Sequence, residues 1–229
     1  MSDEKKKEFE EGKVILIDKP LHWTSFDVVR KIRGSIRIKK VGHAGTLDPL
    51  ATGLLIICTG KFTKKINDYM AKEKEYTGAF ILGHVTPTYD LESQPEQPKD
   101  YSFVTNELLL QTIPKFIGEI EQMPPIYSAI KKDGVALYEL ARRGIDVELK
   151  ARKITIHSFE ITQVELPVVH FKITCSTGTY IRSIAHDFGQ MLGCGAYLSN
   201  LRRTKIGECN VENAMEMDVF LDSIATQNQ

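Results

Sequence analysis

The stretch VGHAGTLDPLATGLLIICTG, residues 41–60, joins a glycine-containing loop directly to an apolar run. The loop glycines permit positive φ angles and the close approach of another backbone. Pro49 biases Asp48 toward an extended conformation and away from a helix. The following GLLIICTG, residues 53–60, has the length and apolar character of a buried strand. The stretch therefore predicts a stiff loop that presents one carboxylate, as a nucleophile or a general base requires.

A lone carboxylate in such a loop has other interpretations. A phosphate-binding loop would follow the pattern G-x-x-x-x-G-K-[ST], but Leu55 stands where the first glycine belongs and Phe62 follows the lysine. A calcium loop would need several acidic residues at alternate positions, and Asp48 is the only acid in the stretch. A purely structural turn remains open at this point.

Hydrophobic periodicity and turn residues predict the elements around this loop. Strands are predicted at residues 14–18, 53–60, 73–83, 153–165, 168–176 and 196–208. Helices are predicted at residues 24–37, 61–70, 106–120 with an interruption near Pro114, 135–143 with Asp133 as its cap, and 179–193, with a short acidic helix at the end. The mixture lacks a regular βαβ period and predicts an α+β fold with a mixed, mostly antiparallel sheet. We expect a charged, disordered tail at residues 1–12 and one catalytic domain over 13–229.

The net charge is zero, because 30 Lys and Arg residues balance 30 Asp and Glu residues. This balance argues mildly against a nucleic-acid partner, but the charges are clustered. Between residues 31 and 65 the chain has eight basic residues against Asp48 alone, and residues 90–121 are mostly acidic. Basic clusters can bind phosphates while acidic segments cancel the total charge, and solvated helix faces explain the clusters equally well.

Metal, disulfide and membrane sites are not expected. The four cysteines form no CxxC pair, and the six histidines show no metal-ligand spacing. The charged first residues have no apolar core, and no apolar run is long enough to cross a bilayer. The sequence therefore predicts reduced thiols, no metal and a cytoplasmic protein.

Three more residues could carry chemistry. Arg182 can pair with a carboxylate and keep it ionised. Tyr76 offers a flat face for a nucleobase and a hydroxyl for proton transfer. His43 could be a general base. Each of these residue types is more often structural, and no spacing rule links the three to Asp48.

Six motifs in order carry a resemblance over residues 12–224. They are IDKPLHWTS (17–25), VGHAGTLDPLATGLL (41–55), EKEYTGAFILGHVTPTYD (73–90), MPPIYSAIKKDGVALYELARRG (123–144), CSTGTYIRSIAHDFG (175–189) and LSNLRRTKIG (198–207). The chain resembles the TruB-type tRNA pseudouridine synthases, which isomerise uridine 55 in the T loop of tRNA. The resemblance implies the pseudouridine synthase fold, with a central catalytic cleft across the sheet. His22 stands where the family commonly has glycine.

The resemblance also implies roles for individual residues. Asp48, Tyr76 and Arg182 match the family's catalytic aspartate, its base-stacking tyrosine and the arginine that pairs with the aspartate. The implied substrate-binding residues are Lys19, Pro20, His43, Asp90 and Leu201, with Asp90 holding the arginine. The candidate phosphate contacts are Lys61, Lys64, Lys131, Lys132, Arg142, Arg143, Arg152, Arg202 and Arg203.

The implied partner is the T stem-loop of tRNA, gripped by an insertion at residues 124–152. We expect a monomer that needs no protein partner and has no separate C-terminal RNA-binding domain. The isomerisation gains and loses no atoms and includes no redox step, so no cofactor is implied.

Three alternatives stay open. A non-catalytic RNA-binding or RNA-folding module could use the same scaffold, although it would have no chemical need for Asp48, Tyr76 and Arg182 together. An aspartyl-phosphate enzyme would want Mg²⁺ and further acids beside Asp48. Relatives that work with guide RNAs and partner proteins share the reaction, but they are usually longer.

Overall fold

The computed structural model describes residues 3–128, 130–132, 134–145 and 147–225. The chain divides into two compact units, Met1–Tyr76 with Leu201–Gln229, and Thr77–Asn200. Strands β4 (Lys74–Leu82) and β10 (Ala196–Ile206) each contribute to both units. No helix in the described part of the chain is both long and apolar enough to cross a membrane.

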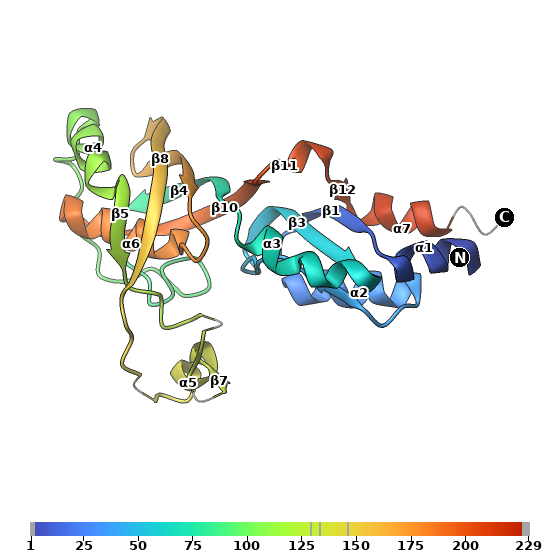
Figure 1. Ribbon diagram of the computed structural model, residues 1–229. Helices are drawn as coiled ribbons and strands as arrows, with labels where there is room; N and C mark the ends of the chain where they lie inside the picture. Colours follow the sequence, from blue (N-terminus) through green and yellow to red (C-terminus); the bar gives the residue numbers. More distant parts are fainter. Residues whose placement is uncertain (1–2, 129, 133, 146, 226–229) are drawn as a thin grey trace. The chain divides into compact units, whose positions relative to one another are not determined.

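The first unit is a mixed sheet covered by helices (Figure 1). Its helices are α1 (Asp3–Glu11), α2 (Ser25–Ile36), the 3₁₀ helix η1 (Gly60–Lys65), α3 (Ile66–Met70), the 3₁₀ helix η3 (Val211–Asn213) and α7 (Met217–Ala225). Its other strands are β1 (Val14–Lys19), β2 (Val41–His43), β3 (Ala51–Thr59), β11 (Cys209–Asn210) and β12 (Met215–Glu216). The strand order is β12-β1-β3-β10, with β2 on β3 and β11 on β10. β3 pairs antiparallel with β1 and parallel with β10, so the sheet is mixed.

The apolar run of β3 is buried on both faces, and this explains its composition. Successive side chains of a strand point to opposite faces. Leu55 and Ile57 belong to a core cluster with α2 and α7, whereas Leu54, Ile56 and Cys58 belong to a second cluster beside η1 and α3. A strand covered on both sides reads as a continuous apolar run rather than an alternating one.

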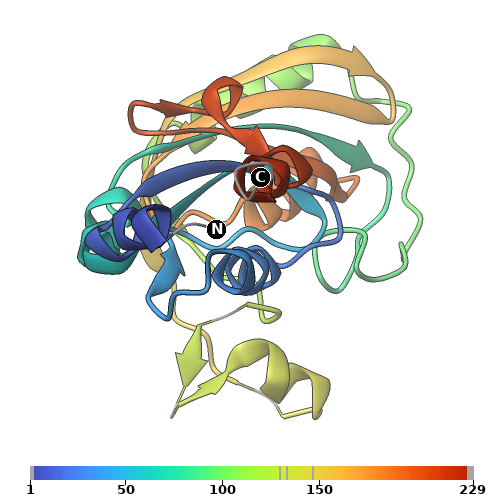
Figure 2. The ribbon, with the colours of Figure 1, turned by 90° about the vertical axis from the view of Figure 1, so that its right-hand side faces the viewer.

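The second unit is a sheet with the strand order β10-β4-β9-β8-β5. Its elements are α4 (Asn106–Thr112), the 3₁₀ helix η2 (Ile113–Phe116), β5 (Gly118–Gln122), β6 (Lys131–Lys132), β7 (Val135–Ala136), α5 (Leu137–Arg142), β8 (Arg152–Glu165), β9 (Val168–Cys175) and α6 (Ile181–Leu192). β5, β8 and β9 pair antiparallel. The chain between β5 and β8 leaves this sheet and carries β6, β7 and α5 (Figures 1 and 2). This excursion contains the residues for which an RNA-gripping insertion is expected, and that role stays a prediction.

Phenylalanines fill the core of the second unit. The rings of Phe80 on β4 and Phe171 on β9 stack with centroids 4.2 Å apart. Phe188 of α6 lies 5.6 Å from both Phe80 and Phe159, so α6 packs on one face of this sheet. This packing fixes the helix that carries Arg182.

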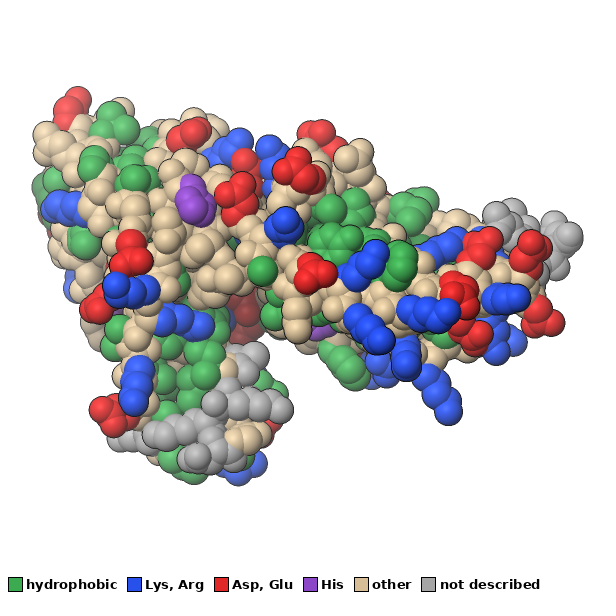
Figure 3. All heavy atoms as spheres, in the orientation of Figure 1, with side chains coloured by type: hydrophobic (Ala, Val, Ile, Leu, Met, Phe, Trp, Pro, Cys, Tyr) green, Lys and Arg blue, Asp and Glu red, His purple; other side chains and the backbone are tan. Residues whose placement is uncertain are grey.

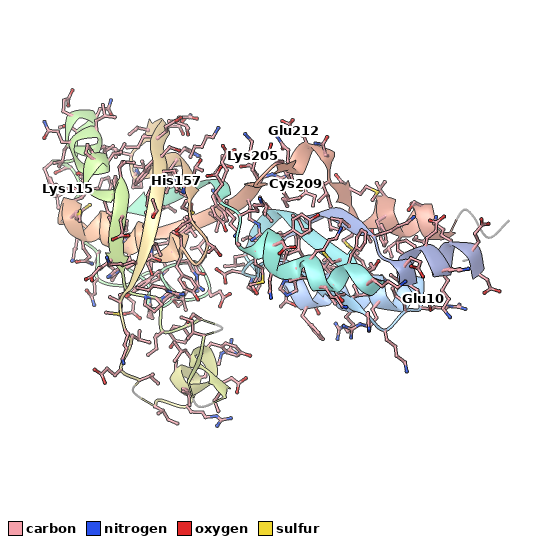
Figure 4. All side chains as sticks on the ribbon, in the orientation of Figure 1. Glu10, Lys115, His157, Lys205, Cys209 and Glu212 are labelled. Atoms are coloured by element: carbon pink, nitrogen blue, oxygen red, sulfur yellow. The ribbon has the colours of Figure 1, made fainter. Side chains whose placement is uncertain are left out.

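The predicted α+β class with a mixed sheet is confirmed, but several boundaries were wrong. Residues 3–11 form α1 rather than a tail, because Phe9 is buried at 3% exposure while polar residues such as Glu10 face outward (Figure 4). The helix expected over 106–120 ends at Phe116, because Gly118 takes a φ of 91° and starts β5.

Two further helices differ from the prediction, one in its helix type and one in its first residue. The helix expected over 61–70 starts as 3₁₀ and becomes α only at Ile66. Helix α5 begins at Leu137. Its expected cap, Asp133, lies outside the described residues.

Candidate active site

The loop at residues 44–50 is fixed to both β3 and α2. The Leu47 N–H donates to Ser25 Oγ at 2.8 Å, and the Ala51 N–H donates to the Asp48 carbonyl at 3.0 Å. Asp48 itself is partly exposed, whereas Leu47 is buried. These hydrogen bonds thus hold the backbone of the loop in place, with Asp48 partly exposed; the role of its carboxylate stays a prediction.

Arg203 braces this loop from inside the first unit. Its Nε donates to the Leu54 carbonyl at 2.8 Å, and its two Nη atoms donate to the carbonyls of Gly45 at 3.1 Å and Thr46 at 3.5 Å. The side chain is 1% exposed, so the expected phosphate contact at Arg203 was wrong. Strand alternation could have indicated this, because Arg202 and Arg203 must point to opposite faces of β10.

Lys19 is a second buried cation in this unit. Its Nζ donates to the carbonyls of Trp23 at 2.5 Å and Pro20 at 2.9 Å, and the residue is fully buried. Burial lowers the pKa of Lys19 to about 8, while the negative charge of Asp48 opposes this shift. Lys19 therefore closes the turn after β1 and places a positive charge where it interacts with Asp48.

The turn after β1 is joined to the loop at residues 44–50 by His22. The His22 N–H donates to the Pro49 carbonyl at 2.8 Å. His22 has a φ of 66°, the left-handed region that favours glycine. Histidine thus occupies a left-handed position that glycine would adopt without strain.

Three other expected residues of the first unit lie on neighbouring strands. His43 ends β2 opposite Ile57, and Leu201 of β10 is paired with Ala51 at the start of β3. Burial and the charge of Arg203 lower the pKa of His43, so its imidazole is neutral at physiological pH. Tyr76 of β4 is 8% exposed.

Arg202 has a partner within the fold. Its Nη1 and Nη2 atoms lie 3.0 and 2.5 Å from the two carboxylate oxygens of Asp18, a bidentate ion pair between β10 and β1. This geometry gives Arg202 a structural contact that the sequence did not predict.

The remaining candidate phosphate contacts lie on η1, on β8 and on the excursion between β5 and β8. Lys61 and Lys64 are on η1, and Lys61 pairs with Glu11 at 2.5 Å. Lys131 and Lys132 form β6, and their side chains are outside the described part of the structure. Arg142 ends α5 and Arg143 follows it, and Arg152 lies 4.7 Å over the ring of Tyr180.

Arg182 and Asp90 meet in the interior of the second unit. Arg182 Nε lies 3.6 Å from Asp90 Oδ2, and the two side chains are each 5% exposed. The Arg182 Nη atoms donate to the carbonyls of Thr88 at 3.2 Å and Tyr127 at 3.0 Å. The guanidinium is therefore held from several sides in one orientation.

The turn that carries Asp90 packs against α6. Thr88 Oγ donates to Asp90 Oδ1 at 2.6 Å. Tyr89 has a φ of 64°, and its ring stacks on His186 with centroids 4.0 Å apart and planes 18° apart. Sequence reasoning missed Tyr89 and His186, because no local pattern relates residues so far apart in the chain. Beside them, burial raises the pKa of Asp187 to about 6.

The structure brings the expected residues together in two groups. Asp48, Lys19, His43 and Leu201 belong to the first unit, and Arg182 and Asp90 belong to the second. The pairing of Asp48 with Arg182 and the cleft between them stay predictions. Among the described residues, no group of three His, Cys, Asp or Glu side chains could hold a metal ion. All four cysteines are free thiols, including Cys209 on β11 (Figure 4).

Comparisons with known proteins point to one family. The family model "TruB family pseudouridylate synthase (N terminal domain)" matches residues 33–181, and the model "tRNA pseudouridylate synthase B C-terminal domain" matches residues 182–229. The tRNA pseudouridine synthase B of Flavobacterium johnsoniae is 53% identical over 224 residues, which are 95% of this chain and 98% of that protein. That of Chlorobaculum tepidum is 49% identical over 220 residues, 94% of this chain and 92% of that protein.

Solved structures show the same fold. A chain of a Cbf5-Nop10-Gar1 complex matches 93% of this chain with a TM-score of 0.72 and 29% identity. A chain of an archaeal box H/ACA sRNP Nop10-Cbf5 complex matches 96% with a TM-score of 0.71 and 25% identity. This chain spans about half of each of them, 54% and 56% of their lengths.

Proposed function

The chain belongs to the TruB family of pseudouridylate synthases, and from this premise we propose that it converts uridine 55 in the T loop of tRNA to pseudouridine. The observation that carries the proposal is the braced loop that leaves Asp48 partly exposed. Relatives named tRNA pseudouridine synthase B match nearly the whole chain, which supports tRNA as the substrate.

The reaction needs one well-placed carboxylate rather than an external reagent. The bond from uracil N1 to ribose C1′ breaks, and a bond from C5 to C1′ forms. C5 loses its proton and N1 gains one, so substrate and product contain the same atoms. Asp48 acts on the ribose, and its position determines whether the glycosidic bond breaks.

Charges in both units support this role of Asp48. Lys19 interacts electrostatically with Asp48 within the first unit. We assign Arg182 as the ion-pair partner of Asp48 and Asp90 as the group that orients the guanidinium. An opposite charge favours the ionised form of a carboxylate, and this is the role that we assign to the Arg182 guanidinium.

The target uridine must leave its stack before it can react. Unstacking costs a few kcal/mol, and stacking on Tyr76 offsets part of that cost. The neutral imidazole of His43 supports the everted loop, and Pro20 and Leu201 line the base pocket. Phosphates are bound by cations of η1 and of the excursion between β5 and β8. These cations are Lys64, Lys131, Lys132, Arg142 and Arg143.

A tRNA transcript labelled with tritium at uracil C5 tests the proposal, because rearrangement releases that tritium to water. We expect one equivalent released per tRNA, a carbodiimide-dependent primer-extension stop at position 55, and neither signal from a transcript with cytidine 55. Release from another position would overturn the site specificity. Tight tRNA binding without release would favour the non-catalytic RNA-binding module.

A further inference from the structure

A groove of about 540 Å³ lies in the first unit, between the turn after β1 and the outer face of α2. The residues that line it are His22, Trp23, Asp27, Arg30, Lys31, Gly34 and Ser35. None of them takes part in the reaction as described above. The lining of the groove thus includes the indole of Trp23, the imidazole of His22 and the cationic side chains of Arg30 and Lys31.

The wall of the groove is physically joined to the catalytic loop. The His22 N–H donates to the carbonyl of Pro49, the residue after Asp48, at 2.8 Å. The Trp23 carbonyl accepts from the Lys19 ammonium, which interacts with the charge of Asp48. The groove therefore lies beside the loop that carries Asp48.

His22 occupies its position at a conformational cost. Its φ of 66° is readily adopted by glycine and is strained for a side chain with a Cβ. Glycine would form the same hydrogen bond to the Pro49 carbonyl without this strain. The imidazole is thus a side chain that the turn does not need, and it lines the groove.

The groove carries a net positive charge. Its one carboxylate, Asp27, accepts from the Thr24 N–H at 3.0 Å and pairs with Arg30 at 2.8 Å. Lys31 adds a positive charge that this pair does not neutralise, and the Arg30 side chain is 72% exposed. On the visible face of the first unit, Figure 3 shows many Lys and Arg side chains interspersed with Asp and Glu side chains.

We propose that this groove binds an unstacked nucleotide of the substrate RNA, with its base on Trp23 and its phosphate between Arg30 and Lys31. Aromatic side chains beside cations form the stacking platforms of single-stranded nucleic-acid binding. Trp23 packs against the core cluster and is partly exposed. Its ring is therefore held in place in the absence of RNA. The inference rests on the proposed function, because it takes the occupant from the same RNA.

Trp23 is the only tryptophan of the chain, so its fluorescence reports on this groove. A stacked base quenches indole fluorescence, and we expect strong quenching at saturating unmodified tRNA. A carbon added at Gly34 meets no atom within 4 Å, so Gly34→Ala leaves the groove open and serves as the matched control for Gly34→Glu. The glutamate places bulk and negative charge in the groove and should abolish the quenching.

The kinetic prediction separates RNA binding from chemistry. Gly34→Glu and His22→Gly should each raise KM about tenfold, the size expected for one lost stacking contact, while kcat stays at the wild-type value and the unfolding midpoint does not fall. Gly34→Ala should behave as wild type. His22→Gly relieves backbone strain, so a loss of affinity cannot be ascribed to misfolding.

Two results would overturn the proposal. One is unchanged Trp23 fluorescence while an independent filter assay shows the tRNA bound, and the other is an unchanged KM in both variants. Failure of the proposed function gives a different outcome, because wild-type protein would then release no tritium whatever the fluorescence shows.

Discussion

Replacing Arg203 by methionine removes the donors that hold the Asp48 loop from inside the first unit. The guanidinium makes two hydrogen bonds of ordinary length, 2.8 Å to the Leu54 carbonyl and 3.1 Å to the Gly45 carbonyl, and a long one of 3.5 Å to the Thr46 carbonyl. Methionine fills similar apolar volume but donates nothing, so these carbonyls lose their charged partner.

The expected loss follows from these contacts. A hydrogen bond from a charged donor contributes about 1.5–3 kcal/mol, so two good ones contribute about 3–6 kcal/mol. Removing a buried charge also removes its desolvation cost, which offsets part of this loss. We expect a net decrease of about 3 kcal/mol in the free energy of unfolding, together with at least a tenfold lower kcat, because the loop no longer fixes Asp48.

Urea unfolding and single-turnover tritium release on the same preparations test this expectation. Arg202→Met is the matched control, because it removes a neighbouring arginine whose pair with Asp18 is partly exposed at 40% and 23%. That variant should lose about 1 kcal/mol or less and keep its kcat. Equal unfolding midpoints for the two variants, or a wild-type kcat in a destabilised Arg203→Met, would refute the bracing role.

Three further predictions concern other charged groups. Burial raises the pKa of Asp187 to about 6, so the ionised carboxylate destabilises the folded protein at pH 7. Asp187→Asn removes this charge and should raise the free energy of unfolding at pH 7 by about 1 kcal/mol, a value reduced because the side chain is partly exposed. This gain in the free energy of unfolding should vanish near pH 4, and urea denaturation at pH 7 and at pH 4 measures it. The kcat should fall as pH rises through about 8, where folded Lys19 loses its proton, and a flat profile from pH 7 to 9.5 would contradict this. Because unfolded lysine keeps its proton to a higher pH, the contribution of Lys19 to stability should rise over the same range. Lys64→Gln should weaken tRNA binding and lower the log–log salt slope by about 1, and an unchanged slope in a filter-binding titration would remove Lys64 from the phosphate contacts.

Locally encoded features of the fold were predictable. The capping box between Thr24 and Asp27 and the apolar spacing of α2 determine where that helix begins and which face it buries. The continuous apolar run of β3 and its flanking glycines determine the buried strand. The loop before it follows from glycine and proline conformations, which depend on a few neighbouring residues.

Features that depend on distant contacts were not predictable. Arg203 lies 158 residues from Gly45, and only the parallel pairing of β10 with β3 brings them together. The stack of Tyr89 on His186 likewise requires the packing of α6. Residues 118–120 were assigned to a helix as a continuation of the apolar spacing that begins at residue 106, but they pair with β8 instead.

Asp48→Asn tests the central claim most directly, because it removes the charge and keeps the size of the side chain. Single-turnover tritium release and tRNA binding are measured on the same preparation. The account predicts no release above background, with a dissociation constant for tRNA close to that of the wild type. Release at the wild-type rate would contradict the assignment of Asp48.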